Sequence, residues 1–222
     1  MSFRNTLILT LTRRLNPRYA YLPPPPSYAP FHILDIGAGP KDGRIAKDLF
    51  PAGHFEAVNI APLDAAQRDA FDFYHQHDLN ADDLSFLPEG GFDYVISSHT
   101  IEHLEDGPPA VAQMYRKVRP RGRICLEWPS VESETFPIKG FGPNFYDDGA
   151  HIRTFPRADI AAVLTAEGFD IEYSGFRRIW LPMLIAPLLV IRPSLKLRRL
   201  VLYGLWDMTG FCYVIRATRR TP

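Results

Sequence analysis

The sequence is poor in cysteine. Its 222 residues include only Cys125 and Cys212, both in apolar runs that are typical of strands. Secreted scaffolds carry more cysteines at regular spacings, so we expect a reducing, cytoplasmic location. We place the two thiols on neighbouring strands and assign them no chemical role, because buried thiols usually only pack. We expect the first apolar stretch to be retained, since it is short, ends at Arg13 and Arg14 and lacks a small-residue cleavage site.

The chain has no excess of charge of either sign. Its 25 basic and 25 acidic residues cancel, which argues against a uniformly basic surface and against nucleic acid as a partner. Acids are nevertheless absent before Asp35 and between Glu172 and Asp207, so both segments are cationic. We therefore expect a contact with an anionic membrane surface, through residues 1–18 and 177–206, as one option. The cations of these segments include Arg4, Arg13, Arg14, Arg18, Arg177, Arg178, Arg192, Lys196, Arg198 and Arg199.

No apolar run is long enough to span a bilayer. The longest, from Ile179 to Ile191, would measure about 20 Å as a helix, against a hydrocarbon core of about 30 Å. Pro182 and Pro187 also interrupt it. For the whole insertion, residues 177–206, four interpretations stay open: a helical pair that covers the core, a dimer surface, a lid over an apolar acceptor, or an interfacial anchor. The sequence does not fix the oligomeric state.

The chain divides into two parts. Apolar residues at helical spacing predict an amphipathic helix over residues 2–16, and the Pro-rich stretch "YLPPPPSYAP" predicts an extended linker up to residue 30. Residues 31–222 form the predicted main domain. Hydrophobic residues make up 46% of the chain and charged residues 23%, which is typical of a globular protein.

The main domain alternates strand and helix signals. This order predicts an α/β fold with a doubly wound, mostly parallel, seven-stranded sheet. The last strand follows the long insertion, so we expect it to be antiparallel. The predicted strands cover residues 32–37, 54–60, 75–78, 91–99, 122–128, 170–176 and 210–220, and the predicted helices cover residues 41–50, 63–74, 109–118 and 157–169.

A glycine turn, "HILDIGAGP", follows the first predicted strand. Ligands bind at the carboxyl ends of strands in such sheets, and Gly37 and Gly39 allow a ligand to approach the backbone. A nicotinamide-binding turn would have a third glycine at position 42, where this chain has Asp42. This departure argues against a nicotinamide oxidoreductase.

Several further segments follow this turn in a characteristic order. They are "AVNIAP", "HDLN", "FDYVISSHTIEHLED", "RKVRPRGRICLEWP" and "HIRTFPRADIAAVLTAEGFDIEYSG". Together with "ILDIGAGP", they resemble a class I S-adenosylmethionine-dependent methyltransferase of the small-molecule group that has an "EHL" segment after the fourth strand. The resemblance covers residues 31–176 and implies a Rossmann-like fold with S-adenosylmethionine as cofactor.

The resemblance implies a cofactor site at the strand ends. Asp35 would accept a hydrogen bond from the cofactor's ammonium group. Asn59 stands where the family usually has an acid that binds both ribose hydroxyls, so the bidentate, charged contact is lost. Asp78 would accept from the adenine amine, or would only form an Asx turn. The implied cofactor-binding residues are Asp35, Gly37, Ala38, Gly39, Asn59, Ile60, Asp78, Leu79, Ser98 and His99, with Ser97 beside them.

Three histidines are candidate general bases: His99, His103 and His151. The alternative is structural, with His103 packing at a helix start and His151 holding a loop. That loop carries Tyr146, Asp147 and Asp148, which we expect on the substrate side. We assign no metal, since His99, Glu102 and His103 share one short segment and lack a fourth ligand from elsewhere.

The expected function is methyl transfer from S-adenosylmethionine to an oxygen, nitrogen or carbon atom of a small molecule, with a lipid-like acceptor as one option. The alternative is a protein that has the same fold and binds an adenosyl ligand without catalysis, which the loss of the acid at Asn59 would favour. The identity of the acceptor is not encoded in any of these motifs.

Overall fold

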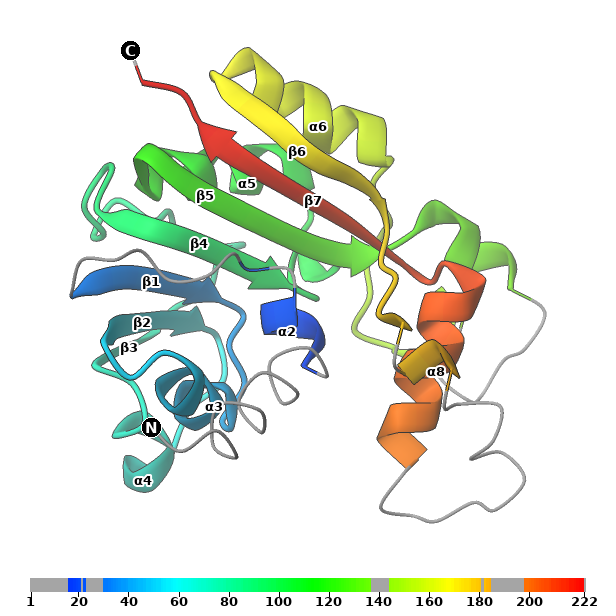
Figure 1. Ribbon diagram of the computed structural model, residues 1–222, viewed down its shortest axis with the longest axis horizontal. Coiled ribbons are helices and arrows are strands. Elements are labelled where there is room, and N and C mark those ends of the chain that lie inside the picture. The colour runs from blue at the N-terminus through cyan, green and yellow to red at the C-terminus, as the bar shows by residue number, and fades with distance from the viewer. Residues whose placement is uncertain are drawn as a thin grey trace.

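The computed structural model describes residues 16–20, 22, 30–136, 144–180, 182–184 and 198–221. In this part of the chain, seven strands form one mixed sheet in the order β3-β2-β1-β4-β5-β7-β6 (Figure 1). The predicted α/β sheet is confirmed. The strands are β1 (Phe31–Ile36), β2 (Gly53–Asn59), β3 (Phe73–Gln76), β4 (Phe92–Ser98), β5 (Val118–Pro129), β6 (Phe169–Phe176) and β7 (Cys212–Arg219).

Helices cover both faces of the sheet, because successive strand residues point to opposite sides. Leu34 of β1 packs in one core with Met114, whereas Ile33 packs in a second core with Ala46 and Tyr19. The first core lies under α5 and α6, and the second lies under α2 and α3. The helices are α2 (Pro17–Ala20), α3 (Asp42–Leu49), α4 (Ala65–Arg68), α5 (Gly107–Lys117), α6 (Arg157–Ala166) and α8 (Arg198–Thr209).

The strand β7 is antiparallel to both of its neighbours, β5 and β6, as predicted. This strand comes from the end of the described chain but lies between two strands that precede it (Figure 1). The free cysteines Cys125 and Cys212 lie on the adjacent strands β5 and β7, which also agrees with the prediction.

The helix predicted over residues 63–74 is wrong in length. Helix α4 spans only Ala65–Arg68, and Asp64 caps its start by accepting a hydrogen bond from the Gln67 N–H. After it, Asp72 joins the chain to β2: its carboxylate accepts from the Phe55 N–H, and its N–H donates to the Phe55 carbonyl. These contacts to a distant strand pull the chain into the extended conformation of β3.

The predicted N-terminal helix over residues 2–16 lies almost entirely outside the described residues, as do residues 23–29 of the predicted linker. The described residues that precede β1 pack on the sheet, with Tyr19 and Leu22 buried. In the insertion, residues 185–197 lie outside the described part, and Ile179 is buried. None of the helices within the described ranges has the length and apolar character that a membrane span requires.

Candidate active site

A cavity of about 470 Å³ lies at the carboxyl ends of β1, β2 and β4. This is the position at which open α/β sheets bind ligands. Of the residues predicted for a cofactor, the walls contain Gly37, Asn59, Ile60, Asp78, Leu79 and His99. They do not contain Asp35, Ala38, Gly39 or Ser98. Sequence reasoning missed the wall residues Val58, His77, Asn80, Thr100 and Leu104, which belong to irregular turns or carry no chemical signal of their own.

The position of Gly37 in the cavity wall requires glycine. Its φ of +82° lies in the left-handed region, and a Cβ there would come 2.0 Å from Oγ1 of Thr100. That hydroxyl is itself held in place, because it donates to the carbonyl of Ile36 at 3.1 Å. The turn therefore exposes bare backbone to the cavity.

Asp35 has a different environment from the one predicted. Its buried carboxylate forms an ion pair with Arg18 and accepts a hydrogen bond from the Tyr19 hydroxyl at 3.3 Å. Arg18 also donates to the carbonyls of Gly37, at 3.0 Å, and Ser98, at 3.1 Å. Burial raises the pKa of Asp35 to about 6, although Arg18 opposes the shift. Asp35 thus holds α2 against the strand ends, and the cavity wall does not include it.

Two polar residues of the cavity wall, Asn59 and Asp78, already have backbone partners. Asn59 donates from Nδ2 to the Ala38 carbonyl at 2.8 Å and accepts at Oδ1 from the Ala61 N–H at 3.2 Å. Each of these groups retains one further hydrogen or lone pair for a ligand. Asp78 accepts from the Asn80 N–H at 2.9 Å, so the predicted Asx turn is present at a residue that also lines the cavity.

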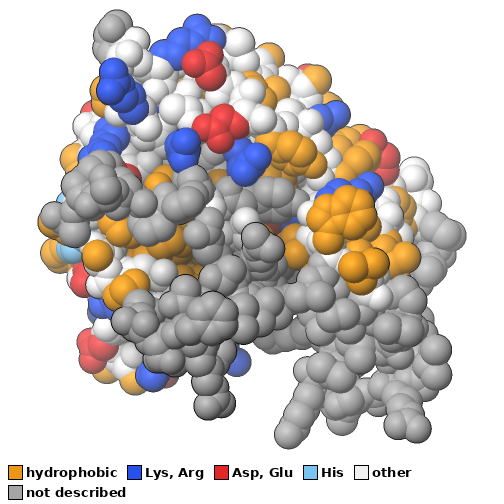
Figure 2. Space-filling view, in the orientation of Figure 1, with side chains coloured by type: hydrophobic (Ala, Val, Ile, Leu, Met, Phe, Trp, Pro, Cys, Tyr) orange, Lys and Arg blue, Asp and Glu red, His pale blue; other side chains and the backbone are white. Residues whose placement is uncertain are grey.

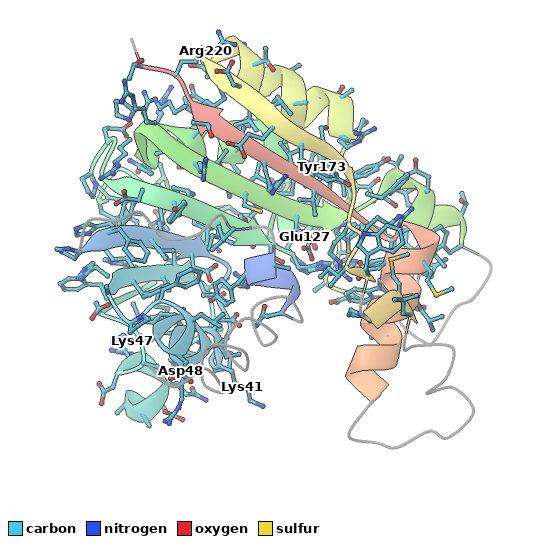
Figure 3. The ribbon with its side chains drawn as sticks, viewed as in Figure 1. Lys41, Lys47, Asp48, Glu127, Tyr173 and Arg220 are labelled. Atoms are coloured by element: carbon cyan, nitrogen blue, oxygen red, sulfur yellow. The ribbon has the colours of Figure 1, made fainter. Side chains whose placement is uncertain are left out.

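His99 joins the cavity to a buried network of charged groups. Its Nδ1 lies 2.9 Å from Glu102, and its Nε2 lies 3.2 Å from Glu127. Arg177 bonds to Glu127 at 2.8 Å and to Asp207 at 2.5 Å, and all three of these side chains are buried. Figure 3 shows Glu127 at the end of β5 that faces α8. Sequence reasoning missed this network, although an acid inside the apolar run "ICLEW" was a signal for it.

His103 and His151 meet beside the cavity. His103 lines the wall, and its ring centre lies 4.9 Å from that of His151. The loop that carries His151 contributes Ala150 to the wall, whereas the predicted loop residues Tyr146, Asp147 and Asp148 do not line it. Tyr146 is exposed. Of the loop residues named here, only Ala150 lines the cavity.

The chain matches one family model, described as "Methyltransferase domain", over residues 4–174. It belongs to this family. A search of curated protein sequences found no match for the methyltransferase.

Solved structures with the same fold cover nearly the whole methyltransferase at low sequence identity. An S-adenosylmethionine-dependent methyltransferase from Archaeoglobus fulgidus is 18% identical over 97% of this chain and 94% of its own, with a TM-score of 0.57. One from Mesorhizobium loti is 18% identical over 88% of this chain and 94% of its own, with a TM-score of 0.60. Haemonchus contortus phosphoethanolamine N-methyltransferase 2, in complex with phosphomonomethylethanolamine and S-adenosylhomocysteine, is 16% identical over 98% of this chain and 52% of its own, with a TM-score of 0.59.

A larger hollow of the methyltransferase, about 720 Å³, lies between α3 and α4. Lys41, Lys47 and Asp48 of its lining appear beside α3 in Figure 3, and the lining includes no strand residue. Because ligands bind at the carboxyl ends of the strands in this type of fold, we assign the active site to the smaller cavity.

The charged network fixes the protonation of His99. Burial alone would lower the pKa of His99, but its contacts with Cys212, Glu102 and Glu127 outweigh burial and raise the pKa well above the usual value. Burial raises the pKa of the Cys212 thiol, although Arg177 and His99 oppose the shift. Burial opposes the ionisation of Glu127, yet Arg177 and His99 lower the pKa of Glu127 to about 2.

We expect His99→Asn to remove a stabilisation that is lost in alkali. Because the pKa of His99 is higher in the folded state, its protonated ring stabilises the fold fully below about pH 6.5, the unfolded value. That stabilisation disappears as the pH rises through the folded-state pKa. Urea unfolding should therefore show a larger difference in free energy between wild type and variant at pH 6 than at pH 10. Asparagine tolerates the φ of +54° at this position.

The substitution His32→Asn is the control for losing an imidazole, because His32 lies at the opposite end of β1. A difference between wild type and His99→Asn that is equal at pH 6 and pH 10 would contradict a charged His99.

Proposed function

We propose that this enzyme transfers a methyl group from S-adenosylmethionine to an oxygen, nitrogen or carbon atom of a small molecule. S-adenosylmethionine is the methyl donor. The observation that carries the proposal is the cavity at the strand ends, where Gly37 has no room for a side chain and Asn59 and Asp78 face the same space. The family match and the solved relatives with bound adenosyl ligands support the same donor.

The cavity suggests an orientation for the two substrates. Asn59, Asp78 and Leu79 line one part and can contact ribose and adenine, so we place the nucleoside there. His103 and Ala150 line another part of the cavity. We place the acceptor in that part, beside the loop that carries His151. Asp35 cannot bind the ammonium group of the cofactor while its carboxylate is paired with Arg18. We therefore place the methionine end of the cofactor against the backbone at Gly37.

In the reaction, a lone pair of the acceptor attacks the methyl carbon, and the electrons of the breaking S–CH₃ bond return to sulfur. The protein mainly orients the reactants, which can supply up to roughly 7–11 kcal/mol. An acceptor that starts as a hydroxyl or ammonium group must also lose a proton. His99 is poorly suited to take it, because both ring nitrogens already contact carboxylates. We therefore propose that the proton leaves on the side of the cavity that His103 and Ala150 line.

A thermal-shift titration tests the donor. At 100 times its dissociation constant, a ligand stabilises the fold by about 2.7 kcal/mol, which raises the melting temperature by roughly 5–10 °C for a chain of this length. We expect this shift with S-adenosylmethionine and S-adenosylhomocysteine, and none with NAD. Asp78→Asn should reduce it. The matched control is Asp83→Asn, since Asp83 forms the same kind of turn with the Ser85 N–H but does not line the cavity.

Absence of a shift with either adenosyl ligand would refute the proposed donor. If the shift occurs, release of S-adenosylhomocysteine during incubation with a library of small acceptors separates an enzyme from a binding protein of the same fold. A shift without turnover on any acceptor would favour the binding protein.

We also propose that this enzyme contacts an anionic membrane and takes a lipid-like acceptor. Trp180 is 70% exposed and Leu184 67% exposed, four residues apart, and Leu205 and Met208 are exposed three residues apart in α8. Such spacings place each pair on one helix face. Arg178 links the two segments by donating to the Asp207 carbonyl. Figure 2 shows hydrophobic side chains gathered next to a basic one on this side of the molecule.

We expect the protein to sediment with phosphatidylserine vesicles, less with phosphatidylcholine vesicles, and less at high salt, because each cation near an anionic surface contributes about 1 kcal/mol. Trp180→Ser and Leu184→Ser should weaken this binding. The control is Phe73→Ser, which removes a 57% exposed aromatic ring from the opposite edge of the sheet. Equal binding by all three variants, or no preference for phosphatidylserine, would contradict the membrane contact.

A further inference from the structure

We propose that Glu102, His103 and His151 form a binding site for a first-row divalent metal ion, such as Zn²⁺, in the wall of the cavity. One carboxylate oxygen of Glu102 and one ring nitrogen of each histidine lie within 4.8 Å of one another. The first two residues belong to the short 3₁₀ helix that follows β4, and His151 comes from the loop before α6. The third ligand is thus remote in sequence, and only the fold brings it to the others.

The first argument is an unsatisfied acid. Glu102 is fully buried. Its Oε1 contacts Nδ1 of His99, but its Oε2 is buried without a hydrogen-bond partner among the described residues. A buried carboxylate oxygen with no partner is costly, and a bound cation would satisfy it.

The second argument is the orientation of the two imidazoles. Nδ1 of His103 lies 3.0 Å from the Ala150 carbonyl, and Nδ1 of His151 lies 2.7 Å from the Phe145 carbonyl. A carbonyl oxygen only accepts, so each Nδ1 carries the proton and each Nε2 has a free lone pair in the neutral ring. Metal-binding histidines are commonly fixed in this way by a backbone carbonyl.

Distances leave room for an ion between these groups. Nε2 of His151 lies 4.0 Å from Oε1 of Glu102, too far for a hydrogen bond. Ligand atoms on one tetrahedral Zn²⁺ lie about 3.4 Å apart at bond lengths near 2.05 Å, so small side-chain rotations complete the set. Two imidazoles and one carboxylate suit Zn²⁺ or Mn²⁺ rather than Mg²⁺, which prefers oxygen ligands.

The ion would be accessible from the cavity. Both His103 and Ala150 line the wall, so the position left open by three protein ligands faces the proposed acceptor. An ion bound there would lower the pKa of an acceptor hydroxyl, a role that rests on the proposed function. The binding of the ion does not depend on that function and can be measured without any substrate.

Two other groups of candidate ligands occur among the described residues, and neither has the same features. The first group consists of His99, Glu127 and Cys212. Both ring nitrogens of His99 already contact carboxylates, and Glu127 is paired with Arg177. In the second, His32 with His54 and Glu56, the carboxylate already accepts from His75 and no atom is buried without a partner. These two groups supply the control variants.

The experiment is calorimetric titration of the full chain, after dialysis against EDTA, with ZnCl₂, MnCl₂ and MgCl₂. We expect one equivalent of Zn²⁺, weaker binding of Mn²⁺ and none of Mg²⁺. Glu102→Gln, His103→Asn and His151→Asn should each weaken Zn²⁺ binding more than about 100-fold, since even the loss of a residue that only orients a ligand costs 10–100-fold. His32→Asn and Cys212→Ser should bind as wild type does.

His103 is partly exposed, so His103→Asn is the variant least at risk of misfolding, and a melting curve without metal checks each one. No Zn²⁺ binding by wild type would overturn the site, and so would binding that is unchanged in both Glu102→Gln and His103→Asn. If only His32→Asn lost Zn²⁺ binding, the ion would belong to the group of His32, His54 and Glu56. If only Cys212→Ser lost it, the ion would belong to the group of His99, Glu127 and Cys212. Because adenosyl ligands are absent, none of these outcomes tests the methyl donor.

Discussion

Gly37→Ala abolishes the stabilisation by S-adenosylhomocysteine and lowers the free energy of unfolding by about 2–6 kcal/mol. This expected loss combines two costs. The φ of +82° disfavours any residue with a Cβ, and the added carbon would meet the Thr100 hydroxyl at 2.0 Å. Strained backbone and overpacking each cost about 1–3 kcal/mol. Thr100 cannot simply rotate away, because its hydroxyl holds the end of β1.

Gly168→Ala is the matched control for this substitution. Its φ of +81° is nearly the same, but a Cβ there would meet nothing within 4 Å. It should cost only about 1–2 kcal/mol and leave ligand binding unchanged. Urea unfolding gives the stabilities, and the thermal shift gives the binding. Equal costs at the two positions would mean that the contact with Thr100 is unimportant, and retained binding in Gly37→Ala would place the cofactor elsewhere.

Arg177→Met lowers the free energy of unfolding by about 3–5 kcal/mol, the range typical for removing one partner of a buried ion pair. The variant leaves Glu127 and Asp207 buried without the guanidinium that bridges them. The control is Arg220→Met, because Arg220 and Asp170 form an exposed pair that should contribute less than about 1 kcal/mol. Figure 3 shows Arg220 at the far end of the sheet from Glu127.

Adding Glu127→Gln and Asp207→Asn to Arg177→Met separates charge from packing. If the buried charges cause the loss, the triple variant should recover part of the stability, since neutral replacements of a buried network are often tolerated. Urea unfolding at pH 7 measures all four proteins. A triple variant as unstable as Arg177→Met would show that the loss comes from the packing of the Arg177 side chain against Trp206.

The fold could be predicted because its signals are local. Alternating strand and helix patterns, glycine at the first turn and the long insertion before the last strand are each visible within a short window, and they gave the sheet and its antiparallel member. The predicted length of helix α4 was too great because the contact that ends the helix joins it to a residue far away in the sequence. The contact of Asp72 with Phe55 joins positions that no periodicity relates.

The site could be predicted only in part for the same reason. The glycine turn and Asp78 lie in recognisable segments, whereas the partner of Asp35 is Arg18, a residue counted among the surface cations of segment 1–18. The partner of Glu127 is Arg177, in an insertion for which the sequence left core, dimer surface, lid and membrane contact open. Such pairs form where the fold brings distant charges into the same buried space, and one sequence carries no pattern for them.

The position of β7 determines when the enzyme can become active during synthesis. This strand fills the gap between β5 and β6, yet the ribosome makes it after both. Until Cys212 to Arg219 have emerged, the edges of β5 and β6 that β7 will join are unpaired, and Cys212 is missing from the network around His99. The sheet and the network around His99 are therefore completed together, after β6 and the insertion have been made, and a chain that stops before β7 lacks both.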